Sequence, residues 1–469
     1  MNRVTGKELS RRELIRISAW GAGAMALAGS KLAATAAASP PARPNILLVL
    51  SDQQHWQALG CQDPFFQTPN LDRLAKQSVL FERAFCSTPQ CSPSRSSLLT
   101  GLYPSKTGVW GNVGAAGGRK LKMPTVGKHL QKAGYYTAYF GKWHLGDDPA
   151  ANAGWNEADK RTNDALATRN AVAFLDKQAG AKRPFALFVS YLNPHDIYHF
   201  RRSPEDVPGL NIPLADSWAK ETFANKPAPQ KQFMTHDQGR IIWGSGPQAW
   251  RSYRDLYRQK VGLYDAEVGK VLAALKAAGQ WDNTLIVATS DHGDMDTAHK
   301  LIFKGPFLYE HMVRVPLIIR VPAALGGPKA RRIRQDTVNV DLVPTLLDFA
   351  GAPPVTCQGS SLKPALTASG PMPRRDFVVS EYYSKQRWVN PIRMLRTDQY
   401  KYNRYILHGE ELYDLKNDPH ELVNLAGSPK YAKVQKELSA ALDKWIRDNN
   451  DPFAAEWPTD RQGRRLPGV

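Results

Sequence analysis

Cys91 stands in an unusual setting for a cysteine. It lies in the stretch STPQCSPSRSSLLTG, where serines and prolines surround it and Arg95 follows one helical turn later. No CxxC motif or Cys/His cluster nearby marks it as a metal ligand. The residues after it are typical of a short helix ended by Gly101, which would place Cys91 at the positive end of that helix. This position suits a nucleophile that attacks an anionic ester, and a bare thiolate is one possible form.

Polar residues capable of chemistry also follow four apolar, β-prone runs. They are Asp, Gln, Lys or His side chains at the carboxyl ends of the runs: Asp52, Gln53, Lys142, His144, His195, Asp291 and His292. Ligands of α/β proteins bind at the carboxyl ends of the strands. We therefore expect these side chains to share one edge of a sheet.

Four of these residues form a plausible metal site: Asp52, Gln53, Asp291 and His292. Carboxylate and amide oxygens suit a hard ion such as Ca²⁺ or Mg²⁺, whereas the imidazole keeps Mn²⁺ or Zn²⁺ open. A lone aspartate after a strand is more often a turn residue, so the prediction depends on the two pairs occurring together.

A second set would bring positive charge and hydrogen-bond donors to the same edge: Arg95, Lys142, His144, His195 and Lys304. Such groups suit an anionic substrate whose charge shifts in the transition state. Each of these side chains alone would more often be a solvated surface residue.

Helix-like stretches alternate with the strand-like runs. The spacing of apolar residues predicts helices at 70–77, with Asn70 as the N-cap, and at 125–132, 163–177 and 253–278. The alternation indicates an α/β sheet with helices on its faces. From about residue 374 the pattern changes to short β-prone runs followed by an amphipathic helix at 430–448, which predicts a small antiparallel sheet packed with a helix.

The composition is that of a soluble globular protein with a basic surface. The chain has 469 residues and a net charge of +19, which attracts polyanions. No nucleic-acid motif accompanies the charge, so we expect no nucleic-acid partner and favour sulfated or phosphorylated substrates over nucleic acid. A generally basic surface without such a substrate would explain the charge equally well. Four cysteines are too few for a disulfide scaffold, although Cys61 and Cys86 could pair.

The first residues have the form of a twin-arginine signal peptide. Arg11 and Arg12 precede an Ala/Gly-rich run, and small residues near Ala38 offer a cleavage site. We expect export through the Tat machinery to the periplasm, with no membrane span in the mature protein. The expected parts are the signal peptide at 1–38, a catalytic domain at 44–370, and a C-terminal subdomain at 371–469.

The chain resembles the type I sulfatases of the alkaline-phosphatase-like superfamily. CSPSR is similar to their Cys-x-Pro-x-Arg signature. Further similar segments follow in order: RPNILLVLSDQQ, TPNLDRLA, GKWHLG, NPHD, SDHGDM, VRVPLIIR, DLVPTLLDFAG and LYDLKNDPHELVNLA. The resemblance implies a large mixed β-sheet sandwiched by helices, with a smaller C-terminal antiparallel sheet plus a helix.

The resemblance also implies the mechanism. Cys91 would be oxidised to formylglycine by a formylglycine-generating enzyme, and the hydrated aldehyde would attack sulfur. The remaining roles match by position: Asp52, Gln53, Asp291 and His292 with Cys91 as metal ligands, Arg95 and Lys142 at the formylglycine and sulfate, His144 as base, and His195 and Lys304 as sulfate-binding groups, one of which protonates the leaving oxygen. Ca²⁺ is the favoured ion, with Mn²⁺ or Mg²⁺ as alternatives.

Two departures from the family pattern affect these expectations. Gln53 and His292 replace the Asp and Asn of many relatives, which removes one negative charge from the metal site. This pair resembles the phosphonate and phosphodiester hydrolases of the superfamily, although many carbohydrate sulfatases share it. The turn after Asp294 lacks the usual Leu-Gly, so His299 is only a weak candidate for binding substrate. We expect a sulfatase acting on a sulfated carbohydrate or another sulfate ester. The alternatives are a phosphonate monoester or phosphodiester hydrolase and a non-catalytic binder of sulfated polysaccharide.

Overall fold

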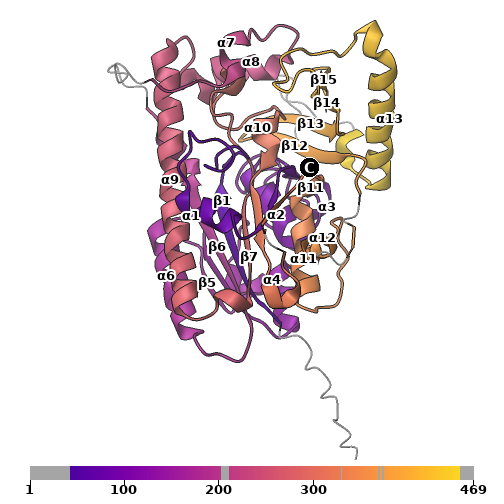
Figure 1. Ribbon diagram of the computed structural model, residues 1–469. Helices are drawn as coiled ribbons and strands as arrows, with labels where there is room; N and C mark the ends of the chain where they lie inside the picture. The colour runs from indigo at the N-terminus through magenta and orange to yellow at the C-terminus, as the bar shows by residue number, and fades with distance from the viewer. Residues whose placement is uncertain (1–42, 202–210, 329, 368–369, 372–373, 455–469) are drawn as a thin grey trace, which may run out of the picture. The chain divides into compact units, whose positions relative to one another are not determined.

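The computed structural model describes residues 43–454, except 202–210, 329, 368–369 and 372–373 (Figure 1). The chain from Arg43 onward clusters into one compact unit. The predicted signal peptide at 1–38 lies outside the described residues. Within the part that is described, no helix is long and apolar enough to cross a membrane.

An eight-stranded mixed sheet is the centre of this unit, with strand order β10-β2-β9-β7-β1-β6-β4-β5. Its strands are β1 (Asn45–Asp52), β2 (Val79–Phe81), β4 (Tyr136–Gly141), β5 (Glu157–Asp159), β6 (Phe185–Pro194), β7 (Thr284–Ser290), β9 (Leu317–Arg320) and β10 (Arg331–Ile333). The adjacent strands β7, β1, β6 and β4 all run parallel. Their carboxyl ends therefore meet at one edge, as the sequence predicts.

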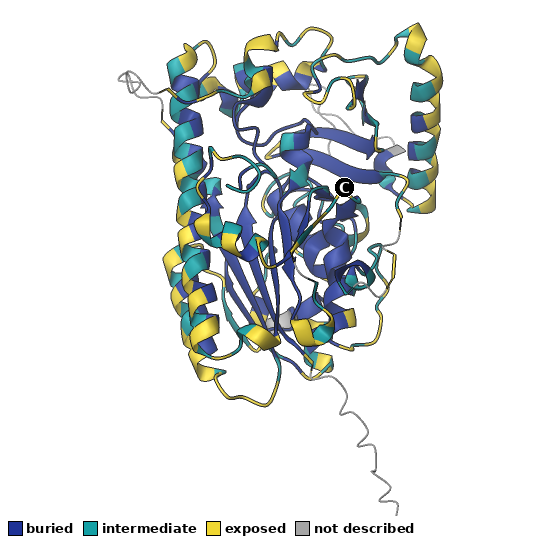
Figure 2. Ribbon diagram, viewed as in Figure 1, coloured by how far each residue is buried: buried dark blue, intermediate teal, exposed yellow. Residues whose placement is uncertain are grey.

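Helices cover both faces of this sheet. Successive residues of its central strand, β1, point to opposite faces, so both faces carry apolar side chains that must be buried. Leu47 and Val49 join one apolar cluster, while Ile46 and Leu48 join the other. One layer contains α1 (Pro69–Ala75), α6 (Asp164–Lys177) and α9 (Pro247–Ala277), and the other contains α2 (Cys91–Thr100), α4 (Val126–Lys132) and α11 (Leu342–Phe349). Figure 2 shows the strands buried between the two layers. The predicted α/β sandwich is confirmed.

Side-chain caps fix the first residues of two of the predicted helices. Asn163 and Thr125 cap α6 and α4 by accepting a hydrogen bond from a backbone N–H, which fixes where each helix begins. The prediction that Asn70 is an N-cap is wrong, because Thr68 precedes the helix and the Asn70 side chain instead binds Asp265. Helix α9 begins at Pro247, six residues earlier than predicted.

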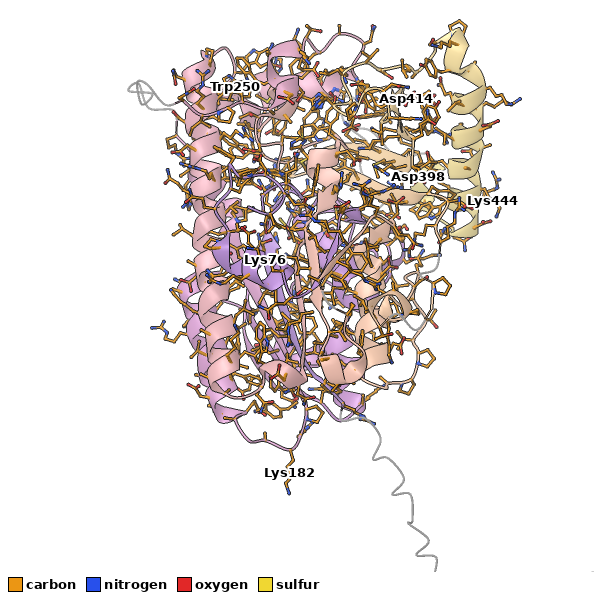
Figure 3. The ribbon with its side chains drawn as sticks, viewed as in Figure 1. Lys76, Lys182, Trp250, Asp398, Asp414 and Lys444 are labelled. Carbon is orange, nitrogen blue, oxygen red and sulfur yellow. The ribbon has the colours of Figure 1, made fainter. Side chains whose placement is uncertain are left out.

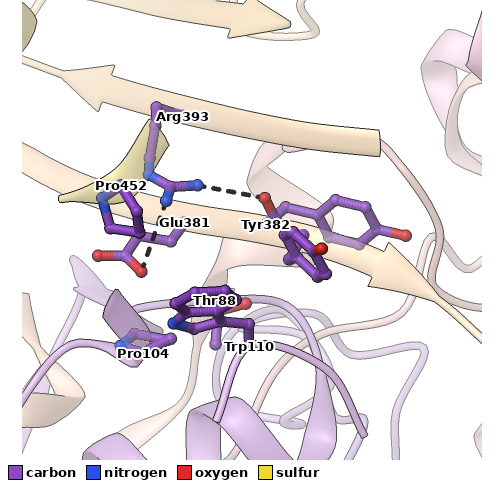
Figure 4. A pocket seen from close by; sticks show the side chains of 8 residues that line it. Thr88, Pro104, Trp110, Glu381, Tyr382, Arg393 and Pro452 are labelled. Carbon is purple, nitrogen blue, oxygen red and sulfur yellow. Dashed lines mark hydrogen bonds and ion pairs between the residues drawn. The ribbon is translucent and has the colours of Figure 1, made fainter. Parts of the chain in front are cut away.

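A four-stranded antiparallel sheet and a helix follow the main sheet in the chain. The strands are β12 (Val378–Lys385), β13 (Trp388–Arg396), β14 (Tyr400–Tyr405) and β15 (Glu410–Asp414), and the helix is α13 (Ala432–Asp448). The buried Arg393 of β13 donates a hydrogen bond to the backbone of Tyr382 and lies 4.0 Å from Glu381 (Figure 4). It also pairs with Asp451 beyond α13. These contacts fasten the sheet to the segment that follows it.

The remaining elements are short. A three-stranded sheet joins β3 (Ala84–Phe85), β8 (Arg314–Val315) and β11 (Thr337–Val338). The short helices are α3 (Pro104–Thr107), α5 (Pro149–Asn152), α7 (Asp216–Lys220), α8 (Ala228–His236), α10 (Glu310–Val313) and α12 (Lys363–Leu366), with 3₁₀ turns η1 (His195–His199), η2 (Gln238–Ile241), η3 (Trp281–Asn283), η4 (Ala298–Lys300), η5 (Ala323–Leu325), η6 (Asn339–Asp341), η7 (Pro429–Tyr431) and η8 (Pro452–Ala454).

Basic side chains lie on the surface of the fold. Lys182 and Lys444 extend away from the fold in Figure 3, and both are exposed.

All four cysteines are free, so Cys61 and Cys86 do not form a disulfide in this structure.

A substitution at Gly141 tests how strand β4 positions Lys142, the residue that follows it. Its φ is +100°, and a Cβ atom there would lie 1.9 Å from the carbonyl oxygen of Ser190 on β6. We expect Gly141→Ala to cost about 2–5 kcal/mol of unfolding free energy, from the left-handed backbone and the clash together, and to lower activity by displacing Lys142.

The matched control is Gly180→Ala, since Gly180 also has a positive φ (+73°) but no atom within 4 Å of an added Cβ. It should cost only about 1–2 kcal/mol and leave activity unchanged. Urea unfolding and turnover measurements on both variants check this. Equal effects of the two substitutions would show that the contact with Ser190 is unimportant.

Candidate active site

Helix α2 presents Cys91 at its first residue, as the sequence predicts. Gln90 before it is extended, and Gly101 ends the helix with a φ of +74°. The thiol is fully buried. Because the first N–H groups of a helix have no partner within the helix, the Cys91 side chain lies where a negative charge is stabilised.

The four parallel strands bring their terminal residues to this helix end. Asp52 is the last residue of β1, and the others follow the ends of β4, β6 and β7: Lys142, His195 and Asp291. Lys142 Nζ lies 2.6 Å from Asp52 Oδ2 and 3.8 Å from Cys91 Sγ. Segments that are far apart in the chain thus converge on one thiol.

Arg95 joins α2 to β6 and to the end of β1 and the residues that follow β4 and β7. Its guanidinium donates hydrogen bonds to Asp52 Oδ2 (2.9 Å) and Asp291 Oδ2 (2.8 Å). It also donates to the carbonyl oxygen of Lys142 (2.6 Å) and to Ser190 Oγ (2.7 Å). The side chain is 1% exposed, so this charge is stabilised by its partners rather than by water.

Four groups lie close enough together to hold a metal ion. One ligand atom each from Asp52, Cys91, Asp291 and His292 lies within 4.8 Å of the others, and all four residues are buried. Gln53 adjoins this group: its backbone N–H donates to Asp291 Oδ1, while its side-chain Oε1 accepts from a lysine ammonium. Two carboxylates with a nitrogen and a sulfur ligand fit a divalent cation.

The two carboxyl groups differ in their electrostatics. Burial and Cys91 raise the pKa of Asp52, but Lys142, His195 and Lys304 outweigh them and hold that pKa below its ordinary value. Burial and the charge of Asp52 raise the pKa of Asp291. A divalent cation would favour the charged form of both carboxyl groups.

Cations surround the Cys91 thiol. Lys304 Nζ lies 2.9 Å from Cys91 Sγ and 2.8 Å from the Gln53 side-chain oxygen. His144 and His195 also interact with the thiol. Burial raises the pKa of Cys91, but Lys142, Lys304 and His292 lower it well below its ordinary value. The site therefore stabilises an anion at this position.

The protonation of the neighbouring groups follows from the same charges. Burial, with Lys142 and Lys304 nearby, lowers the pKa of His195 to about 3, so this imidazole is neutral near pH 7. Burial lowers the pKa of Lys304, but Cys91 and Asp52 outweigh this and raise it. Near pH 7, Lys304 is therefore positively charged, whereas His195 is neutral.

The structure brings together ten of the predicted site residues and leaves out His299. The ten are Cys91, Arg95, Lys142, His144, His195, Lys304, Asp52, Gln53, Asp291 and His292. The His299 ring instead hydrogen-bonds Glu221 (2.8 Å) and stacks on Tyr309. His299 itself has a positive φ (+57°), and this backbone turn directs its side chain into that other cluster. Its prediction as a substrate-binding residue has no support in these contacts.

Two further residues, to which the sequence analysis assigns no role, contribute to the site. Asp294 accepts a hydrogen bond from Gln53 Nε2 (2.7 Å) and so orients that amide. Lys385, in the C-terminal sheet, donates to the carbonyl oxygen of Lys304. Asp294 is part of the SDHGDM segment and could have been identified from it, whereas no local pattern marks Lys385.

The arrangement can polarise an anionic ester and position a nucleophile. One edge of the sheet contains the buried Cys91 thiol, in a position that stabilises an anion, together with two lysines and a metal-binding group. Fixed charges in such a buried site stabilise charge that develops in a transition state. The site therefore fits nucleophilic attack on an anionic ester.

The metal-binding group predicts that a divalent cation stabilises the protein. Dialysis against a chelator should lower the melting temperature, and Ca²⁺ at 100 times its Kd should restore about 2.7 kcal/mol of unfolding free energy. Asp291→Asn should remove most of this ion-dependent shift, because it removes a ligand charge.

The matched control is Asp265→Asn, which changes a buried carboxylate of α9 that binds Asn70 and Leu71 outside the site. The ion-dependent shift should survive in this variant even if its stability falls. Calorimetry with and without the ion checks both variants, and an equal shift in Asp291→Asn and the wild-type protein would contradict the assignment.

Comparisons with known proteins bear on the chemistry of this site. Residues 44–352 match the family model Sulfatase, and residues 298–448 match the model N-sulphoglucosamine sulphohydrolase, C-terminal. The chain is 30% identical to the Delta 4,5-hexuronate-2-O-sulfatase of Bacteroides thetaiotaomicron, over 89% of this chain and 92% of that protein.

Solved structures show the same architecture. A 2-O GAG sulfatase superposes with a TM-score of 0.78 at 28% identity, covering 88% of this chain and 94% of that one. The phosphonate monoester hydrolase of Agrobacterium radiobacter superposes with a TM-score of 0.71 at 23% identity, covering 91% and 100%, and at that identity it shares the fold alone. The chain belongs to the sulfatase family and is a sulfuric ester hydrolase.

Proposed function

We propose that this sulfatase desulfates a carbohydrate and that its nucleophile is formylglycine made from Cys91. The observation that carries the proposal is the position of Cys91, at the first turn of α2 and within the group that can bind a metal. In formylglycine an aldehyde oxygen replaces the sulfur atom, so the contacts of Cys91 Sγ mark where that oxygen would lie.

Hydration explains why an aldehyde serves better than a thiol or a serine. Residue 91 in its hydrated form offers two hydroxyl groups. Attack of one on the sulfur of the ester forms a new S–O bond while the bond to the alcohol breaks, and the alcohol oxygen takes a proton. Loss of a proton from the second hydroxyl re-forms the carbonyl and releases sulfate. Water then restores the hydrate without attacking a crowded, anionic sulfur.

The surrounding residues have separate roles in these steps. Lys142 and Lys304 are placed to bind the sulfate oxygens, since both ammonium groups lie beside Cys91 Sγ. His144 is our candidate for the base that takes the proton from the second hydroxyl. Lys304 is favoured over His195 as the proton donor to the alcohol, because burial and nearby cations keep His195 neutral.

Ca²⁺ is the ion that we propose for Asp52, Gln53, Asp291 and His292, with residue 91 completing the set. The oxygen ligands are hard, which favours Ca²⁺ over softer ions, while Mn²⁺ and Mg²⁺ are the alternatives that His292 and the carboxylates leave open. When bound, the ion polarises the sulfate group and makes the hydroxyl groups at position 91 more acidic.

Several observations support a carbohydrate as the substrate. The names of two similar proteins, the hexuronate-2-O-sulfatase and the 2-O GAG sulfatase, indicate that those proteins act on sugars. The basic composition of this chain also suits a polyanionic glycan. We also propose a formylglycine-generating enzyme as a partner. The twin arginines in residues 1–38 support Tat export to the periplasm.

A mass spectrum of the tryptic peptide 84–95 tests the nucleophile. In protein from a host that contains the modifying enzyme, we expect residue 91 as the aldehyde or its hydrate. Cys86 lies in the same peptide and should remain a thiol, which makes it an internal control. A thiol at Cys91 in fully active protein would sink the proposal.

A comparison of substrates distinguishes a sulfatase from a phosphonate hydrolase, the alternative suggested by the presence of Gln53 and His292. We expect a higher kcat/KM for an aryl sulfate than for the matching aryl phosphonate, and a higher value still for a sulfated glycan. The shared aryl group controls for binding of the leaving alcohol. Faster phosphonate turnover would favour the alternative function, and turnover of aryl or alkyl sulfates alone would exclude the carbohydrate.

A further inference from the structure

Lys385 is a buried lysine at the end of β12, and its environment is unusual for a cation. The side chain is 4% exposed. Its ammonium donates hydrogen bonds to the backbone carbonyl oxygen of Lys304 and to the Tyr198 hydroxyl, 3.0 Å away. Tyr198 in turn stacks on Phe303 and adjoins His195. The lysine therefore contacts the wall of the active site from the C-terminal sheet.

No carboxylate of the described residues lies within ion-pair distance of Lys385. Lys401, another buried lysine of the same sheet, provides the contrast. Its ammonium lies 2.9 Å from Glu310 and 2.7 Å from Glu421. Ion pairing thus accounts for the burial of Lys401 but not for that of Lys385.

Burying an unpaired ammonium group costs free energy, since water no longer solvates the charge. Burial, followed by the charge of Lys304, lowers the pKa of Lys385 to about 7, while Asp237, Asp294 and Cys91 oppose this. Stability of the fold alone therefore does not explain a lysine at this position. Groups held in such costly settings beside an active site are candidates for a functional role.

The contact with Lys304 suggests what this role is. Lys304 follows Phe303, whose φ of +58° is unfavourable for a non-glycine residue. Tyr253 holds this turn on one side by accepting a hydrogen bond from the Phe303 N–H, 2.9 Å away. Lys385 holds the other side through the Lys304 carbonyl. The two contacts direct the Lys304 ammonium toward Cys91 Sγ.

We propose that Lys385 is a positioning residue, which fixes the backbone of Lys304 so that its ammonium group faces the sulfate at residue 91. The inference rests on the sulfate-binding role proposed above for Lys304. It assigns to the C-terminal sheet a direct part in catalysis through Lys304. Since small displacements of a catalytic group cost up to about 10²-fold in rate, one hydrogen bond to the backbone is enough to matter.

Lys385→Met tests the proposal, because it retains an unbranched side chain of similar length and removes the donor. We expect kcat to fall on the order of 10²-fold with a smaller change in KM, while the melting temperature stays the same or rises. Lys385→Arg, which retains a charged donor, should recover part of kcat. Turnover of an aryl sulfate and thermal unfolding provide both readouts.

Lys401→Met is the matched control, since it removes a buried lysine of the same sheet that has carboxylate partners. It should lower the melting temperature, because Glu421 loses its cation and Glu310 loses one of its cationic partners, and it should affect kcat less than Lys385→Met does. A Lys385→Met variant with wild-type kcat would overturn the proposal. So would parallel losses of stability and activity with no recovery in Lys385→Arg.

Lys304→Met separates this inference from the function on which it rests. If Lys304→Met is inactive while Lys385→Met is fully active, only the positioning role fails. If Lys304→Met retains wild-type turnover, the role proposed for Lys304 fails as well. In the double variant we expect no further loss beyond Lys304→Met, because the two residues act on one step.

Discussion

The guanidinium group of Arg95 fixes the geometry on which the rest of the site depends. It joins Asp52 at the end of β1, Ser190 of β6, the carbonyl of Lys142 after β4 and Asp291 after β7. Cys91 lies one helical turn before Arg95 on α2, so the same interaction also sets the position of the residue that we propose as the nucleophile. Because the charge is buried and is shared between Asp52 and Asp291, removal of either carboxylate would leave it only partly compensated, at a cost of up to about 3–5 kcal/mol.

The charges of the site are balanced for two ligands of opposite sign. Asp52 and Asp291 meet Arg95 on one side and remain within reach of a cation at His292. Lys142 and Lys304 lie on the side of the nucleophile, where an anionic ester would bind. A divalent ion held there would add positive charge to the same low-dielectric region, and this would strengthen the attraction for charge that develops on an anionic ester. We therefore expect the two carboxylates to act mainly by holding Arg95 and the proposed ion.

Much of the fold and site could be predicted from sequence because both follow local rules. Apolar runs that stop at Asp52 and Asp291 indicate buried parallel strands, and the parallel arrangement itself brings their ends together. Other features depend on contacts between distant segments. The backbone turn at His299 carries that ring away from the nucleophile, and Lys385 reaches the site only because β12 packs beside Lys304. Neither can be inferred from spacing along the chain.

The segment that carries Lys304 belongs physically to the C-terminal sheet as much as to the main sheet. Lys401 of β14 bonds the carbonyl of Leu308 and pairs with Glu310, to which Arg396 of β13 is also joined. With Lys385, three cations of the small sheet thus contact the stretch from Lys304 to Glu310, and the Lys385 contact is the one made at Lys304 itself. A domain boundary near residue 370 would divide the polypeptide but not the site. Any substitution that shifts these strands also shifts Lys304, which limits how far the C-terminal sheet can vary without loss of catalysis.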